Sequence, residues 1–304
     1  MIVANHPKVR QVIVTVAVCL FCVAAQSARA ELSSSRARRA LTRMTSFELT
    51  SGAVRVKNIT DTSRTTADVT AELRTVFRFE QDERGRWRVA EVRTAPNRWE
   101  EVTTITSALA ALSPLNECNA PDLQLRRESA VDLSPKRARC LLGSLFGVPV
   151  PSDAMRIQEI APFAIPLASK ASTTVVAWIR VDARAVNDSK GWRITELRTG
   201  NHEWVNLDKL VAAVNQEKQR LARADLQRIA DALEKYRTDR GNYVVSDSHA
   251  VLIDHLSPRY IRDVIRLDPW SQPYKYVGQK DRFTLVSPGP DGKDGTEDDI
   301  ARSK

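Results

Sequence analysis

The feature that most constrains the fold is an internal duplication in the first two thirds of the chain. The segments Trp87 to Thr94 and Trp192 to Thr199 agree at five of eight positions. A second tryptophan follows each segment, Trp99 in the first and Trp204 in the second, and the offset between the copies is 105 residues in both cases. Agreement in residue type and in spacing indicates a repeat, so one small fold is expected twice.

Each repeat carries the pattern of a helix followed by an antiparallel hairpin. Apolar and polar residues alternate along Val69 to Phe79 and along Val175 to Ala183, which is the period of a strand with one face on a core. Turn residues follow both strands, and the first tryptophan of each repeat opens the return strand. Helices are expected earlier in each unit, over Ser33 to Met44 and Pro135 to Phe146.

Each unit is therefore predicted to be a small α+β fold with a curved antiparallel sheet, over residues 31–113 and 114–206. This pattern resembles the cystatin-like or NTF2-like class of domains, and the resemblance is at the level of the fold and covers no catalytic motif. Such folds host both enzymes and binding modules, so the class alone does not define a function. Glu91 and Glu196 lie on strand faces where cross-strand salt pairs with arginine are expected.

The N-terminal 30 residues are interpreted as a secretory signal. Two basic residues precede an apolar run from Val12 to Ala25, and small residues at 28 and 30 predict cleavage after Ala30. The alternatives are an uncleaved membrane anchor, for which the run is short of the roughly 20 residues needed, and lipid attachment at Cys19 or Cys22. The mature chain is expected to be periplasmic or secreted, with no membrane span after cleavage.

Export changes the interpretation of the two cysteines that remain, Cys118 and Cys140. One pair in an oxidising compartment favours a disulfide over a metal site or a nucleophile. The bond would close a loop of about 20 residues and contribute roughly 3 kcal/mol. The alternative is a pair of buried free thiols.

The positive charge of the chain is scattered. The formal net charge is +9, and removal of the signal with its three basic residues leaves +6. Most basic residues alternate with acids or fall on strand faces, and no stripe of basic and aromatic residues of the kind that binds nucleic acid is found. Nucleic acid is therefore not an expected partner.

The last third, residues 207–304, changes to helical periodicity. One apolar stripe runs from Leu207 to Val214 and a second from Leu226 to Tyr236, in steps of three and four residues. The polar stretch between them could be a linker or a break, and Gly241 is placed to cap the helix. A short helix within 249–260 and strands at 274–277 and 282–287 are expected further on.

An acidic loop near the C-terminus is predicted to bind a cation. Five carboxylates fall within nine residues, at Asp291, Asp294, Glu297, Asp298 and Asp299. Such a loop folds tightly only around a cation, and calcium accepts a shell of carboxylate and carbonyl oxygens. Glycines at 289, 292 and 295 permit tight turns. Lys293 excludes an EF-hand, because it stands where that loop needs an oxygen ligand. The alternative is a solvated acidic tail.

The same region resembles the soluble domain of the major pseudopilins of type II secretion systems. The resemblance rests on three ordered motifs, Leu233 to Tyr243, Asp268 to Tyr276 and Ser287 to Ile300. It implies a long helix packed on a small antiparallel sheet, with calcium holding the last loop. The ligand positions that it implies are Asp291 and the pair Asp298 and Asp299, with Glu297 nearby and backbone carbonyls completing the shell.

No nucleophile with a base is found, so we interpret the chain as an exported, non-enzymatic structural or binding protein. It would contain two repeats and a pseudopilin-like calcium module, with protein partners in the cell envelope and a possible place in a type II secretion assembly. One alternative is a small-ligand carrier or enzyme with a pocket in the repeats lined by Trp87, Trp178 and Trp192. Another is a true subunit of a pilus-like filament. Nothing in the sequence indicates the oligomeric state.

Overall fold

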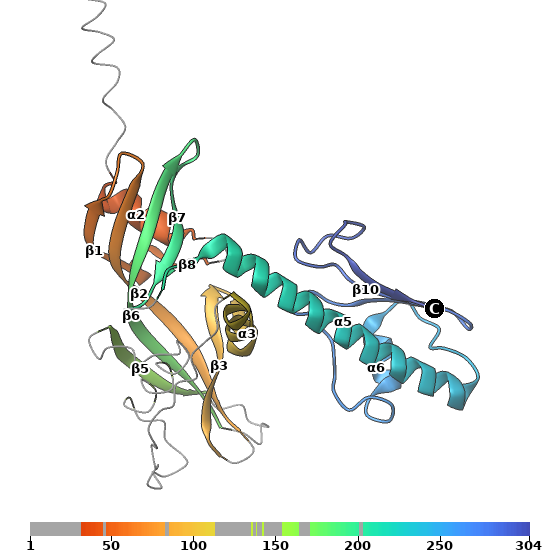
Figure 1. Cartoon of the computed structure of the whole chain (residues 1–304). Coiled ribbons are helices and arrows are strands. Elements are labelled where there is room, and N and C mark those ends of the chain that lie inside the picture. The colour runs from red at the N-terminus through yellow and green to blue at the C-terminus, as the bar shows by residue number, and fades with distance from the viewer. Residues whose placement is uncertain are drawn as a thin grey trace, which may run out of the picture.

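The computed structural model describes residues 32–44, 47–82, 85–112, 154–163, 171–200 and 203–304, together with residues 135, 138 and 142. The predicted signal segment 1–30 and both Cys118 and Cys140 lie outside the described residues. The fold is α+β, as predicted, with a large antiparallel sheet at one end and a long helix on a small sheet at the other (Figure 1).

The large sheet is formed by strands from both predicted repeats. Its main path runs β4-β3-β2-β6-β7-β8, while β1 pairs with β2 and β5 pairs with β6. In the first repeat the short helix η1 (Ser51–Ala53) precedes the strands β1 (Val54–Asp61), β2 (Thr66–Gln81), β3 (Trp87–Ala95) and β4 (Arg98–Glu101). In the second the strands are β5 (Met155–Phe163), β6 (Ser172–Asp188), β7 (Gly191–Arg198) and β8 (Val205–Asn206).

The two halves join through the long central strands. β2 and β6 pair antiparallel from Thr66 opposite Val186 to Glu80 opposite Ser172, with Leu73 opposite Ile179 at the centre. Leu73 and Ile179 are 106 residues apart, one more than the offset between the tryptophans, so the predicted repeats pair through corresponding strands. Each half also has a register shift where the long strand meets its hairpin partner, after Arg78 and after Arg184. The halves therefore share one sheet rather than forming two.

One hydrophobic core underlies this shared sheet. Alternate residues of β2 and β6 face it, and they are fully or nearly fully buried, for example Val69, Phe79, Val175 and Ala183. The helix α2 (Ser34–Thr42) covers the core from one side and packs against β1 of its own half and β7 of the other. The helix of the first repeat therefore stabilises a hairpin of the second.

The three tryptophans considered as pocket lining do not come together. Trp87 belongs to the core and Trp192 packs at its margin. Trp178 lies between Ala177 and Ile179, which both face the core, so strand alternation places its side chain on the opposite face of β6. There its indole donates a hydrogen bond to Gln158 and stacks under the Arg55 guanidinium. Trp178 therefore lies on the opposite face of β6 from the core that contains Trp87, and the pocket in the repeats stays a prediction.

Two further helices follow the edges of the sheet. The helix α3 (Val102–Leu112) leaves β4 and packs against the first turns of the long helix α5 (Leu207–Arg240), which leaves β8. The starts of the two helices are again 105 residues apart. Of the two alternatives for the polar stretch, a linker or a break, the structure shows continuous helix. One helix of 34 residues runs from the N-cap Asn206, whose side chain accepts the Lys209 N–H, to Gly241 with φ 81°.

The far half of α5 packs on a second, separate core. Here the helix α6 (His249–Leu256) and the strands β9 (Lys275–Gly278), β10 (Phe283–Ser287) and β11 (Ile300–Ser303) form a small module, with the strand order β11-β10-β9. Leu226, Ile229 and Leu233 of α5 meet Tyr276 and Leu285 of the sheet in its core. β9 and β10 match the predicted strands, whereas β11 was not predicted. No described helix is long and apolar enough to span a membrane.

The cross-packing of α2 gives a specific expectation for stability. Leu41 and Leu285 are both fully buried, one in each core. Leu41→Ala is expected to cost about 2–5 kcal/mol and to speed amide hydrogen exchange in β6 and β7, because the lost contact lies in the shared core. Leu285→Ala is the matched control, with faster exchange confined to β9–β11. An effect of Leu41→Ala that stops at β1–β3 would contradict a shared core.

Candidate functional site

The acidic loop occupies residues 288–299, between two paired strands. Ser287 at the end of β10 lies opposite Ile300 at the start of β11, so the loop leaves and re-enters the sheet at one point. Its glycines, Gly289, Gly292 and Gly295, have φ of 65°, 66° and 76°. These left-handed conformations favour glycine, as the sequence pattern predicted.

Carboxylates of the loop converge on the hydroxyl group of Thr296. Thr296 Oγ1 lies 2.6 Å from Asp298 Oδ1, 3.4 Å from Asp291 Oδ1 and 3.5 Å from Asp299 Oδ1, and 3.2 Å from the Lys293 carbonyl oxygen. Three of the four predicted ligand residues are therefore neighbours. Thr296 itself was missed by the sequence reasoning, which considered only acidic side chains.

Backbone N–H groups hold the same carboxylates. The N–H of Asp291 donates to Asp298 Oδ2 at 3.0 Å, that of Lys293 to Asp291 Oδ1 at 2.8 Å, and that of Gly295 to Asp299 Oδ2 at 2.8 Å. These bonds relieve part of the repulsion between the acids. Hydrogen bonds, first from the Thr296 hydroxyl and then from the Asp291 N–H, lower the pKa of Asp298.

The lowered pKa of Asp298 has a defined sign for stability. A carboxyl group whose pKa is lower in the folded chain stabilises the fold above its unfolded pKa. That contribution is lost as the pH falls through the folded pKa. The hydrogen bonds to Asp298 therefore stabilise the folded loop at neutral pH, and this stabilisation is lost in acid.

The other two acids of the loop lie outside this group. Glu297 is exposed and makes no hydrogen bond or ion pair within the described part of the chain. Asp294 is also exposed and forms a salt bridge with Lys275 of β9. The structure thus separates the five acids into a convergent set of three aspartates and two peripheral residues.

The fit of a cation to the loop depends on its oxygen atoms. Within the described ranges, no group of three or more His, Cys, Asp or Glu side chains is arranged to hold a metal ion by itself. The neighbours of Thr296 Oγ1 are nevertheless all oxygens, from three carboxylates and one carbonyl, and calcium prefers such a set. The residues fit calcium in donor type, with backbone oxygens needed beside the side chains.

A buried aspartate fastens the base of the loop to the rest of the module. Asp268 is only 4% exposed. Its Oδ1 accepts the N–H groups of Trp270 and Gln272, and its Oδ2 accepts the Ser287 hydroxyl at 2.5 Å. The Gly289 N–H in turn donates to Ser287 Oγ. The predicted Asp-Pro-Trp turn therefore anchors the base of the loop to the rest of the module.

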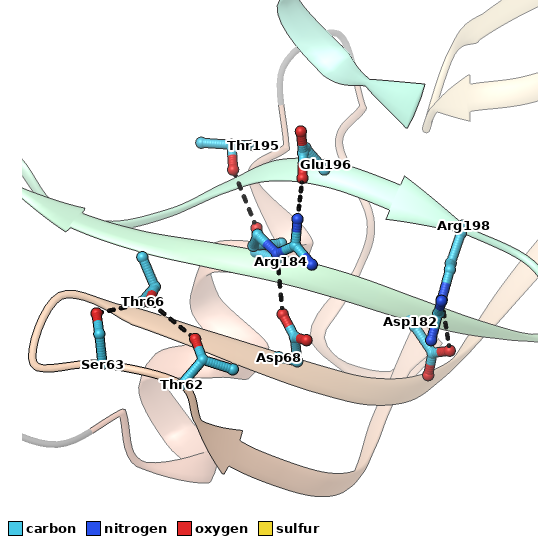
Figure 2. Close-up of polar contacts among 9 residues, drawn as sticks. All are labelled: Thr62, Ser63, Thr66, Asp68, Asp182, Arg184, Thr195, Glu196 and Arg198. Atoms are coloured by element: carbon cyan, nitrogen blue, oxygen red, sulfur yellow. Dashed lines mark hydrogen bonds and ion pairs between the residues drawn. The ribbon is translucent and has the colours of Figure 1, made fainter. Parts of the chain in front are cut away.

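A second polar group lies on the large sheet near the start of α5 (Figure 2). Arg184 of β6 contacts Asp68 of β2 at 3.1 Å and Glu196 of β7 at 2.7 Å, while Arg198 of β7 contacts Asp182 of β6 at 3.2 Å. The hydrogen bond to Asp68 is the main cause of the raised pKa of Arg184. The sequence predicted cross-strand pairing for Glu196, and Figure 2 shows its partner on the neighbouring strand.

This network positions the beginning of α5. The Trp204 ring, just before β8, lies 4.3 Å from the Arg184 guanidinium and 4.6 Å from that of Arg198. In the first half, Arg78 pairs with Glu91 and stacks on Trp99 in the same way. Each such pair is partly exposed and contributes at most about 1 kcal/mol. Their effect is on strand register and helix direction more than on total stability.

A buried ion pair then fixes α5 to the first half. Lys218 Nζ lies 2.5 Å from Glu100 Oε2 of β4, and the two side chains are 7% and 16% exposed. Removing one partner of such a pair leaves a charge without compensation, at a cost of about 3–5 kcal/mol. Further along, Asn215 of α5 accepts a hydrogen bond from the Trp270 indole of the small module. α5 is therefore tied to both parts of the molecule.

The small module has the architecture expected of a pseudopilin-like soluble domain: a long helix on a three-stranded sheet, closed by a glycine-containing acidic loop. Residues 209–303 match the family described as Type II secretion system (T2SS), protein G. The Type II secretion system core protein G of Escherichia coli (strain K12) is 33% identical over 89 residues. The resemblance predicted for the C-terminal region is confirmed.

The comparisons do not extend to the whole chain. The match to the Escherichia coli protein covers 25% of this chain and 61% of that protein. No solved structure matches significantly. The cystatin-like or NTF2-like resemblance of residues 31–205 and the predicted domain limits stay predictions from the sequence.

Two glycines of the loop provide a matched test of its packing. A Cβ on Gly289 would lie 2.4 Å from the Asp298 carbonyl oxygen, whereas one on Gly295 would meet nothing within 4 Å. Both residues have positive φ, so alanine is strained at either position. Gly289→Ala is expected to lower the melting temperature of the small module clearly more than Gly295→Ala, as measured by circular dichroism. Equal effects would show that the close approach to Asp298 is unimportant.

Proposed function

We propose that this chain is an exported, non-enzymatic component of a type II secretion or related envelope assembly. Its C-terminal module would be the part that contacts the assembly. The main support for this proposal is that the family match over residues 209–303 coincides with the helix-on-sheet module. The large sheet would support that module at the far end of α5.

The polar groups of the described residues suit a structural role. Arg184 pairs with both Asp68 and Glu196, and Arg198 pairs with Asp182. The pKa of Glu91 is raised by burial, although Arg78 beside it acts in the opposite direction. A carboxylate that is occupied by an arginine is a poor general base, so these groups support strand pairing better than they support catalysis.

The proposed function also includes the location of the mature chain and a disulfide between its two cysteines. Cleavage after Ala30 would release the mature chain into the periplasm or the medium, where protein partners of the cell envelope are available. Cys118 and Cys140 would then form a disulfide in the second half. The offset of 105 residues between the paired tryptophans, and between the starts of α3 and α5, supports the origin of the large sheet from a duplicated unit.

Secretion in the native host tests the proposed function. Deletion of the gene is expected to lower type II substrates in the medium and to leave them in the periplasm. The full chain should restore secretion, Gly295→Ala should restore it, and Gly289→Ala should restore it less well, because its loop is distorted. Immunoblots of medium and periplasm measure the outcome. Normal secretion in the deletion strain would overturn the proposal.

We further propose that calcium binds the loop, through oxygens of Asp291, Asp298, Asp299 and the Lys293 carbonyl, with Glu297 at the margin. The bound ion would offset two of the three negative charges of these carboxylates and hold β10 and β11 together. Calcium modules outside the cytosol often have a Kd of about 10⁻⁴ to 10⁻³ M, so millimolar calcium is sufficient to occupy them. Calcium at about ten times its Kd would stabilise the folded state by about 1.4 kcal/mol.

Millimolar calcium is therefore expected to raise the melting temperature of the small module and to slow hydrogen exchange in β10 and β11. Asp291→Ala should abolish both effects. Asp294→Ala is the control, because Asp294 pairs with Lys275 outside the convergent group. The wild-type chain in EDTA supplies the baseline for both measurements. An unchanged melting temperature in calcium would refute the site and leave the secretion proposal standing.

A further inference from the structure

We propose that the outer face of α2 binds the surface of a membrane that contains anionic phospholipids. This short helix carries Arg36, Arg38 and Arg39, and Arg43 follows at its C-cap. All four arginines are exposed, and α2 contains no acidic residue. The proposal concerns the repeat half and does not depend on the function proposed for the C-terminal module.

The fold holds this basic surface rigidly outward. Ala37, Ala40 and Leu41 of α2 are buried in the shared core, at 0%, 8% and 0% exposure. With 3.6 residues per turn, Arg36, Arg39 and Arg43 then lie above one another on a solvent-facing side. The Ser33 side chain caps the helix by accepting the Arg36 N–H. The fold therefore fixes the backbone positions from which the arginines project into solvent.

Three arginines of this surface differ from the arginines of the sheet in their ion pairing. Among the described residues, Arg38, Arg39 and Arg43 form no ion pair with a carboxylate. The arginines of the sheet differ, since Arg184 and Arg198 each contact an aspartate. Like charges three or four residues apart destabilise a helix slightly. An anionic partner would remove this cost.

The neighbouring elements leave the surface positive. α2 packs against β1 and β7. Of their charged residues, Lys57 pairs with Glu72, Arg193 with Asp188 and Asp208, Glu196 with Arg184, and Arg198 with Asp182. Arg55 stacks on Trp178, and Asp61 is exposed at the far end of β1. Glu48 is the exposed acid beyond the C-terminal end of α2, where the Leu49 N–H donates to the Thr42 carbonyl.

The chemistry of the surface favours lipid phosphate over nucleic acid. Guanidinium groups bind phosphate oxygens in pairs. α2 has no aromatic residue on which bases could stack, which single-stranded nucleic acid binding uses.

Vesicle sedimentation with the full chain tests the proposal. The variant Arg38→Gln, Arg39→Gln, Arg43→Gln removes three of the charges. The control Arg64→Gln, Arg223→Gln, Arg262→Gln removes three equally exposed charges elsewhere that form no ion pair in the described structure. Vesicles of phosphatidylglycerol mixed with phosphatidylcholine are compared with pure phosphatidylcholine, at low and high salt, and circular dichroism confirms that each variant is folded.

Wild type and control are expected to bind the anionic vesicles, with binding reduced by salt. The α2 variant should bind on the order of 100-fold more weakly, since each arginine near an anionic surface contributes about fivefold. Equal binding to neutral vesicles, or equal loss in the two variants, would overturn the proposal. So would short duplex DNA that binds wild type more tightly than the anionic vesicles and loses binding only in the α2 variant.

Discussion

The pairing of β2 with β6 is the interaction on which the rest of the molecule depends. It brings equivalent strands of the two halves side by side, with Leu73 opposite Ile179 at the centre. Because the two strands share one core, α2 of the first half can cover β7 of the second. The same arrangement places α3 beside the beginning of α5 and so sets the direction in which the chain leaves the sheet.

The C-terminal module is organised by a different principle. Its sheet has three short strands, and a small core on α5 supplies the burial that these strands need. Buried polar groups then fix its loops: Asp268 receives three hydrogen bonds, and the Tyr274 hydroxyl donates to Asp225 of α5. Burial raises the pKa of Tyr274, so this donor stays protonated at all ordinary pH values.

Much of this architecture was predictable because it follows local periodicity. The alternation along β2 and β6, the stripe of α5 and the glycines of the loop were all visible in the sequence. The joining of two repeats into one sheet was not, because strand pairing between distant segments leaves no local signal. The roles of Thr296 and Asp268 were missed for a related reason. Each depends on hydrogen bonds to residues that only the fold brings close. The sequence left the continuity of α5 open because its middle stretch is polar. In the structure, Lys218 of that stretch is buried in an ion pair with Glu100.

The continuity of α5 makes it a lever. Its 34 residues span about 51 Å at 1.5 Å per residue. The N-terminal part of α5 packs against α3 and is held by the Lys218–Glu100 pair, close to Trp204. The small module packs on its other half (Figure 1). A rotation of about 10° at the gripped end would carry the tip of the helix through about 9 Å, given that length. Small repacking steps at the large sheet would thus displace the far end of α5 on the scale of a helix diameter.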